Sequence, residues 1–110
     1  MRLQMEPLAL TEANFEAEVG RYGGLAVIDF WAPWCGPCQM FSPIVDEIAA
    51  DPPTGVKVCK VNVDEQPGLA VRYQVMSIPT LLLVKGGRAA ATSVGFQGKE
   101  AVLALIEKHR

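Results

Sequence analysis

A run of eight apolar or nearly apolar residues, from position 25 to position 32, constrains the fold of this chain more than any other feature. It reads Leu-Ala-Val-Ile-Asp-Phe-Trp-Ala, and Asp29 is the only charged residue within it. A strand with one solvated face alternates polar and apolar residues, whereas a parallel strand covered by helices on both faces is apolar throughout. The run therefore predicts a central parallel strand with helices on both sides of the sheet.

Strand and helix patterns alternate on either side of this run. Apolar residues at positions 41, 44, 45, 48 and 49 lie on one face of a helix, and paired glycines at 86 and 87 predict a tight hairpin turn. The predicted elements are a strand at 5–10, a helix from the N-cap Thr11 to Gly20, a helix at 35–50 kinked at Pro43, a strand at 56–63, a short helix at 68–73, a hairpin of strands 80–84 and 89–94, and a terminal helix with Val102, Leu105 and Ile106 directed inward. The order predicts a mixed sheet of the α/β class.

Length and charge limit the kinds of partner. At 110 residues, half of them apolar, the chain is expected to form a single domain over residues 1–110. Ten basic and twelve acidic residues create no one-signed field for nucleic acid or anionic lipid. The sequence contains neither an apolar stretch of about 18 residues nor the apolar core of a secretion signal near its start. We therefore expect a cytoplasmic monomer with no nucleic-acid or membrane partner.

The segment Trp34-Cys35-Gly36-Pro37-Cys38 carries the clearest chemical signal, because it joins the buried strand to the first turn of a helix. Side chains three apart on a helix lie about 5 to 6 Å from each other. A disulfide requires Cα atoms roughly 4.4 to 6.8 Å apart. The two sulfurs can therefore form and break a disulfide without a change of fold.

The two cysteines are expected to have different roles. Cys35 at the helix start faces unpaired backbone N–H groups and the positive end of the helix dipole, which both favour its thiolate form. Cys38, one turn deeper, lacks most of this stabilisation. Cys35 would therefore attack a disulfide in another protein, and Cys38 would then attack the resulting mixed disulfide and release the reduced partner.

A zinc site and a purely structural disulfide are the two alternative interpretations of this pair. A zinc site needs two further ligands, and only Cys59 and His109 could supply them, from a strand and from the chain end. We therefore expect no metal. A purely structural disulfide would add little stability, because closing so short a loop removes little entropy from the unfolded chain. Cys59 lies in an apolar strand and is expected to be an inert buried thiol.

Asp29 is the second candidate, since a carboxylate within a buried strand loses its hydration and its pKa should rise. One interpretation makes it the proton acceptor for Cys38, directly or through water. The other makes it a buried polar group held by hydrogen bonds, but its place near the dithiol favours the first. Lys60, in the expected neighbouring strand, either compensates the Asp29 charge or is an ordinary solvated lysine.

A later proline motif and two tryptophans near the dithiol supply further candidates. Ile78-Pro79-Thr80 precedes the hairpin, and a proline at this point can adopt the cis form or simply begin a strand. Trp31 is expected in the core. Trp34, next to Cys35, is expected to shield the sulfur and to contact partners.

The segment from Phe30 to Cys38, with Asp29 before it and Ile78-Pro79-Thr80 after it, closely resembles the thioredoxin family. Nearly the whole chain aligns in order and spacing. Further residues typical of the family stand at the matching positions: Pro43, Asp64, Tyr73, Gly86 and Gly95. The resemblance implies the thioredoxin fold, with a five-stranded mixed sheet and four helices.

The resemblance also implies a set of site residues. Pro79 would be cis and pack against the dithiol, where the backbone of Ser77 and Ile78 is offered to an extended client strand. Lys60 would lie near Asp29 as part of the catalytic set. The flat apolar docking surface would be formed by Trp34, Gly36, Pro37, Ile78 and Gly95.

Gly36-Pro37 between the cysteines resembles the reducing members of the family and implies a protein-disulfide reductase. By analogy, a thioredoxin reductase supplies the electrons, ultimately from NADPH, so the chain needs no cofactor besides its dithiol. The chain departs from the family at Gln39, where Lys or Arg is common, and at the additional thiol of Cys59. An interaction module with an incidental dithiol is the competing interpretation.

Overall fold

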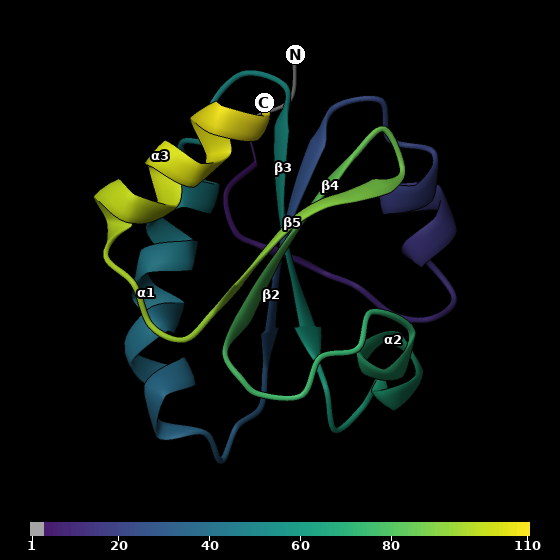
Figure 1. Ribbon diagram of the computed structural model, residues 1–110, viewed down its shortest axis with the longest axis vertical. Helices are drawn as coiled ribbons and strands as arrows, with labels where there is room; N and C mark the ends of the chain where they lie inside the picture. Colours follow the sequence, from purple (N-terminus) through teal and green to yellow (C-terminus); the bar gives the residue numbers. More distant parts are fainter. Residues whose placement is uncertain (1–3) are drawn as a thin grey trace.

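The computed structural model describes residues 4–110 and shows a central sheet with helices on both faces (Figure 1). The elements in chain order are β1 (Leu8–Ala9), η1 (Glu16–Gly20), β2 (Leu25–Trp31), α1 (Gly36–Ala50), β3 (Val56–Asn62), α2 (Pro67–Arg72), β4 (Thr80–Lys85), β5 (Arg88–Val94) and α3 (Lys99–His109). This order confirms the predicted alternation of strands and helices, including the four helical segments.

The five strands form one mixed sheet in the order β1-β3-β2-β4-β5. β2 is the central strand, as the apolar run predicted, and six of its seven residues are buried. It pairs in parallel with β3 but antiparallel with β4, so the prediction of a parallel strand holds on one side only. The pattern could not show this, because helices cover both faces of β2 whichever way its neighbours run.

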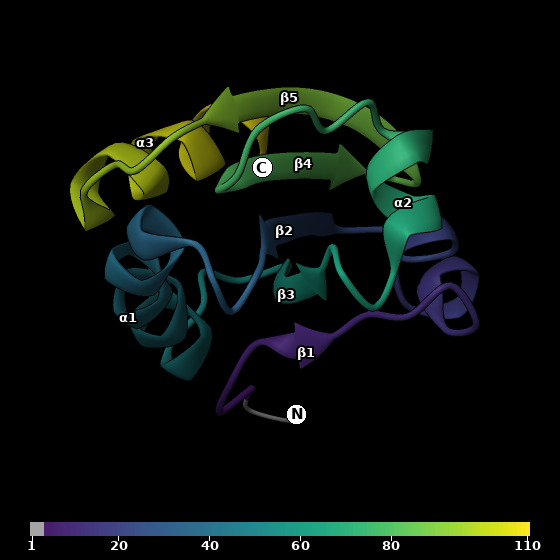
Figure 2. The same ribbon diagram turned by 90° about the horizontal axis from the view of Figure 1, so that it is seen from below.

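Helices cover the sheet in two pairs, and each pair encloses its own core. Figure 2 shows α1 and α3 over one face, and η1 and α2 over the other. The first core includes Leu25, Val27, Phe41, Val45, Ile48, Val58, Leu81, Leu83, Val102 and Ile106. The second includes Phe15, Val19, Ala26, Ile28, Phe30, Val61, Leu69, Leu82 and Val84. Alternate residues of each central strand therefore enter opposite cores.

The amino-terminal region differs most from the sequence prediction. β1 is only two residues long, since Pro7 has no N–H with which to extend the ladder toward its start. Thr11 caps a helical turn as predicted, because its hydroxyl accepts from the Asn14 N–H at 3.0 Å. The segment that follows closes as a π-helix, with the Arg21 N–H donating to the Glu16 carbonyl at 2.9 Å.

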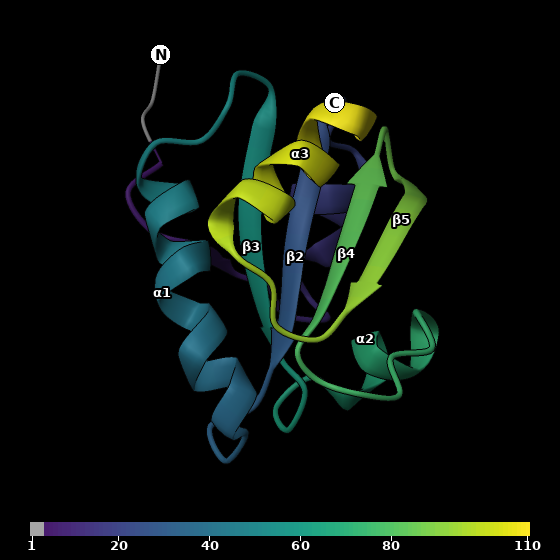
Figure 3. The same cartoon turned by 60° about the vertical axis from the view of Figure 1, so that its left-hand side comes forward.

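The other boundaries lie within about two residues of those predicted. α1 runs unbroken through Pro43, and the predicted kink stays a prediction. The turn between β4 and β5 has positive φ angles of 57° at Gly86 and 80° at Gly87, as the paired glycines indicated. Figure 3 shows α3 lying over the sheet beside α1. Leu105 of α3 is only partly buried, although Val102 and Ile106 point inward as predicted.

Candidate active site

The two cysteines of the motif form a disulfide at the first turn of α1. Their Cα atoms are 5.2 Å apart, within the range predicted from helical spacing. Cys35 is the N-cap residue, with extended backbone angles, and its sulfur accepts from the Cys38 backbone N–H at 3.2 Å. This N–H and the helix dipole would stabilise negative charge on the Cys35 sulfur after reduction. Pro37 occupies the first turn, where a missing N–H costs no helical hydrogen bond.

Two side chains tie down the loop that presents the disulfide. The Trp34 side chain is largely exposed, and its indole Nε1–H donates to Asp64 Oδ2 at 2.9 Å. The Gln39 side-chain amide donates to the Pro33 carbonyl at 3.0 Å. Gln39, the departure from the family pattern, therefore braces this loop instead of adding a positive charge beside Cys35.

The loop before β4 lies directly against the disulfide. The Ile78–Pro79 peptide bond is cis, as the resemblance implied. The Ile78 carbonyl oxygen lies 3.7 Å from the Cys35 sulfur, and the Ile78 side chain packs against the two cysteines. The Gly95 N–H donates to the Pro79 carbonyl at 2.8 Å, which brings the end of β5 to the same place. The carbonyl of Ser77 already accepts from the Thr80 hydroxyl at 2.5 Å.

Exposed apolar residues surround this junction of three segments. Trp34 was predicted here, whereas Met76 and Phe96 are exposed apolar residues that the sequence motifs did not indicate. Met76 is 92% exposed two residues before Ile78, and Phe96 is 50% exposed immediately after Gly95. The signal that could have found them is an apolar residue in a polar loop next to a predicted site residue.

Asp29 is buried without a partner inside the protein. Its side chain projects from β2 toward α1, it is 1% exposed, and neither carboxylate oxygen accepts a hydrogen bond from the described residues. Burial raises its pKa from 3.8 to about 7, which Lys60 counteracts and Asp46 reinforces. The described residues therefore supply no protein hydrogen bond of the kind that the second interpretation expected.

Lys60 lies opposite Asp29 in the parallel pairing of β3 with β2, as predicted. Its ammonium donates to the Ser42 hydroxyl at 3.2 Å and lies 4.6 Å from the centre of the Trp31 ring. Trp31 was predicted in the core, but its side chain is only partly buried and its ring faces the Lys60 ammonium. Sequence reasoning missed Ser42 and Asp46. They follow Cys38 along α1 by four and eight residues, a spacing that places all three on the same helix face.

The remaining thiol, Cys59, lies outside this site. Cys59 is fully buried, and its side chain enters the second core, on the face of the sheet away from α1. Burial raises its pKa to about 12. Within residues 4–110, no group of three or more His, Cys, Asp or Glu side chains is arranged to hold a metal ion. In the same range, no helix combines the length and apolar character needed to cross a membrane.

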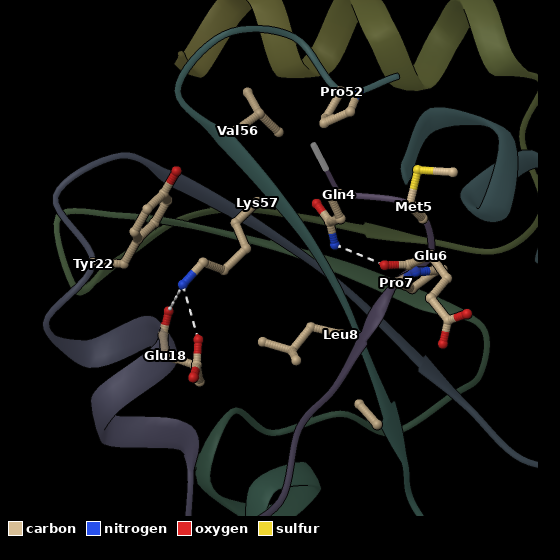
Figure 4. Close-up of a pocket in the computed structure, with 11 residues that line it drawn as sticks. Gln4, Met5, Glu6, Pro7, Leu8, Glu18, Tyr22, Pro52, Val56 and Lys57 are labelled. Atoms are coloured by element: carbon tan, nitrogen blue, oxygen red, sulfur yellow. Dashed lines mark hydrogen bonds and ion pairs between the residues drawn. The ribbon is translucent and has the colours of Figure 1, made fainter. Parts of the chain in front are cut away.

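An open cavity of about 680 Å³ lies near the start of β3 (Figure 4). The disulfide follows the end of β2, which runs parallel to β3, so the cavity lies at the opposite end of these strands. Its lining includes Gln4, Leu8, Tyr22 and Val56. The Lys57 ammonium at its edge is already engaged, because it donates to the Glu18 backbone carbonyl at 2.9 Å and pairs with the Glu18 carboxylate at 3.1 Å. The cavity therefore belongs to a different region from the dithiol.

Comparison with known proteins gives a consistent result. The thioredoxin family model matches residues 6–108. Thioredoxins of Staphylococcus aureus strains Mu50 and N315 are 43% identical over 105 residues, which is 96% of this chain and 99% of theirs. A solved structure of a mutant thioredoxin from Halobacterium salinarum NRC-1 superposes with a TM-score of 0.88 at 36% identity, covering 99% of this chain and 95% of that one.

Proposed function

Because the chain belongs to the thioredoxin family, we propose that it reduces disulfide bonds in client proteins and is itself reduced by a thioredoxin reductase. The chain is a disulfide oxidoreductase, and its redox-active group is the Cys35–Cys38 pair, so it needs no separate cofactor. The observation that carries the proposal is the position of the Cys35 sulfur at the N-cap of α1.

Each cysteine has one step in the proposed reaction. The Cys35 thiolate attacks one sulfur of the client disulfide, the client S–S bond breaks, and the other client sulfur leaves as a thiolate that takes a proton. Cys38 then gives its proton to the Asp29 carboxylate, directly or through water, and its thiolate attacks the Cys35 sulfur. The Cys35–client bond breaks and the second client sulfur leaves as a thiolate that takes a proton, so the client departs with two thiols while Cys35 and Cys38 form the disulfide.

The surroundings of the disulfide support this assignment of roles. The helix N-terminus and the Cys38 N–H act on the Cys35 sulfur, so charge is stabilised at the attacking position. Within residues 4–110 Asp29 has no hydrogen-bond partner, and burial raises its pKa to about 7, which suits a group that takes and returns a proton near neutral pH.

The exposed apolar residues around Cys35 support the docking of an extended client segment. In the proposal, the client lies along the backbone of Ser77 and Ile78 and contacts Trp34, Gly36, Pro37, Ile78 and Gly95. Because the Ser77 carbonyl already accepts from Thr80, the client would pair with the remaining backbone groups of this loop. We also propose a cytoplasmic location, where a dithiol is kept reduced.

Insulin reduction tests the proposal. With dithiothreitol as the electron source, the wild-type protein should accelerate precipitation of the insulin B chain, and Cys35→Ser should reduce this to the uncatalysed rate. Cys59→Ala is the matched control and should leave the rate unchanged, because that thiol is buried in the other core. Equal rates for Cys35→Ser and wild type would contradict the redox assignment and favour an interaction module.

A second assay tests the electron source. Purified thioredoxin reductase and NADPH should reduce the wild-type disulfide, with NADPH oxidation followed at its absorbance band. Failure of every reductase tried, alongside activity with dithiothreitol, would contradict the recycling partner and leave the dithiol chemistry in place.

A further inference from the structure

The Lys60 ammonium is held by two uncharged groups, although an acid lies beside it. Ser42 of α1 accepts its hydrogen bond at 3.2 Å, and the Trp31 ring at the end of β2 lies 4.6 Å from it. Within residues 4–110, Lys60 forms no ion pair with any carboxylate, although three other ion pairs are present. The Lys60 ammonium is therefore not in ion-pair contact with Asp29, its neighbour in the sheet.

This arrangement runs against simple electrostatics. Asp29 is 1% exposed and has no hydrogen-bond partner among the described residues, and opposite charges attract more strongly in a protein interior than in water. Leaving a buried carboxylate unpaired is costly, so a free lysine one strand away would be expected to turn toward it. The hydroxyl and the ring supply the competing contacts, because a cation over an indole and a hydrogen bond to a hydroxyl both stabilise an ammonium.

We propose that Ser42 is a positioning residue whose hydroxyl, together with the Trp31 ring, holds the Lys60 ammonium off the Asp29 carboxyl and leaves that carboxyl free to accept a proton. That the proton comes from Cys38 rests on the proposed function. The positioning of Lys60 by Ser42 does not.

Among the groups around Asp29, Lys60 is the one that lowers the pKa of its carboxyl. β4, its antiparallel neighbour, places the apolar Leu81 opposite Asp29. From α1 comes Asp46, which raises the Asp29 pKa, and from β3 comes Lys60, which lowers it. Lys60 is thus the cation that acts on this carboxyl, and its distance decides how strongly the carboxylate form is favoured. Closer approach would make Asp29 a weaker base.

The placement of Ser42 along α1 suits this role. Cys38, Ser42 and Asp46 follow one another at intervals of four residues, so their side chains are neighbours on one helix face. Ser42 therefore lies between the resolving Cys38 and Asp46 along this face of α1. Threonine at position 42 would keep the hydroxyl, whereas alanine would remove it and is well tolerated in a helix.

The test is a carbon-13 NMR titration of the Asp29 carboxyl, assigned with Asp29→Asn. In Ser42→Ala, Lys60 loses its hydrogen bond and approaches Asp29, so the Asp29 pKa should fall by about 1 pH unit. Ser42→Thr should restore the wild-type value. Ser93→Ala, which removes a half-buried serine on β5, is the matched control and should leave it unchanged.

A double-mutant comparison separates positioning from a general disturbance of α1. Lys60→Met should raise the Asp29 pKa, and adding Ser42→Ala to it should then have no further effect, because no ammonium remains to be released. An unchanged or raised pKa in Ser42→Ala overturns the proposal. An equal fall in the Lys60→Met background also overturns it.

The rate of mixed-disulfide resolution distinguishes this inference from the proposed function. If both are right, the pH midpoint of that rate falls in Ser42→Ala together with the carboxyl titration. If Asp29 is not the proton acceptor, the carboxyl titration still moves while the rate profile does not. The positioning of Lys60 then stands and the role of Asp29 fails.

Discussion

Asp29 links the chemistry of the site to the stability of the fold. Its pKa is raised from 3.8 to about 7 by burial, so between these values the folded protein holds a proton that the unfolded chain has released. The free energy of unfolding therefore decreases as pH rises through this window, and the loss is complete above about pH 7. The residue proposed for catalysis thus destabilises the protein at neutral pH.

Replacing Asp29 with Asn should remove this pH dependence. As pH rises from about 3 to about 8, the free energy of unfolding of Asp29→Asn should increase relative to that of wild type by about 1–4 kcal/mol. Urea unfolding at several pH values measures the difference. Asp51→Asn, at an exposed aspartate, is the control and should show no comparable gain. A constant difference between Asp29→Asn and wild type across this range would contradict the prediction.

The three thiols should differ in reactivity because they differ in environment. In the native reduced protein, iodoacetamide near neutral pH should label Cys35 and spare Cys59, whose pKa is raised to about 12 by full burial. Intact mass and peptide mapping give the site of each label. Unfolding in urea should expose Cys59 to the reagent, and rapid labelling before unfolding would show that it is not buried.

At the scale of elements, the turn between β4 and β5 depends on two glycines for different reasons. Both have positive φ angles, which cost other residues roughly 1–2 kcal/mol. A side chain at Gly87 would in addition collide with the backbone carbonyl of Gly20, at the end of η1, whereas Gly86 has open space around it.

The paired substitutions to alanine separate these two effects. Gly86→Ala should cost only the backbone strain, and Gly87→Ala should lower the free energy of unfolding by at least about 1 kcal/mol more. Chemical denaturation of the two variants against wild type gives the comparison. Equal losses would mean that the contact between the hairpin turn and η1 does not constrain the fold.

At the scale of the whole molecule, the same strands supply both cores, so we propose that residues 1–110 unfold as one domain. Ile106→Ala in the first core and Leu69→Ala in the second should each cost about 2–5 kcal/mol. In both variants, tryptophan fluorescence and far-ultraviolet circular dichroism should report the same urea midpoint. Separate midpoints for the two probes would show that the two faces unfold independently.

The local features of this protein could be predicted from the sequence. The burial of β2, the dithiol at the start of α1 and the glycine turn each depend on a few consecutive residues. In such short segments, backbone geometry alone relates residue spacing to position on a strand, helix or turn. The burial of Asp29 could be predicted as well. So could the position of Lys60 in the strand next to it, since the alternation of strands and helices places β3 beside β2.

Only the tertiary structure decided what each of these residues contacts. It turned Lys60 toward Ser42, left Asp29 without a hydrogen bond from the part of the chain that the structure describes, and brought the Ile78 carbonyl to 3.7 Å from the Cys35 sulfur. It also ran β4 antiparallel to β2. These outcomes depend on segments far apart in the chain that meet only when the sheet forms, and on competing contacts of similar energy. Residue type and spacing alone therefore do not determine them.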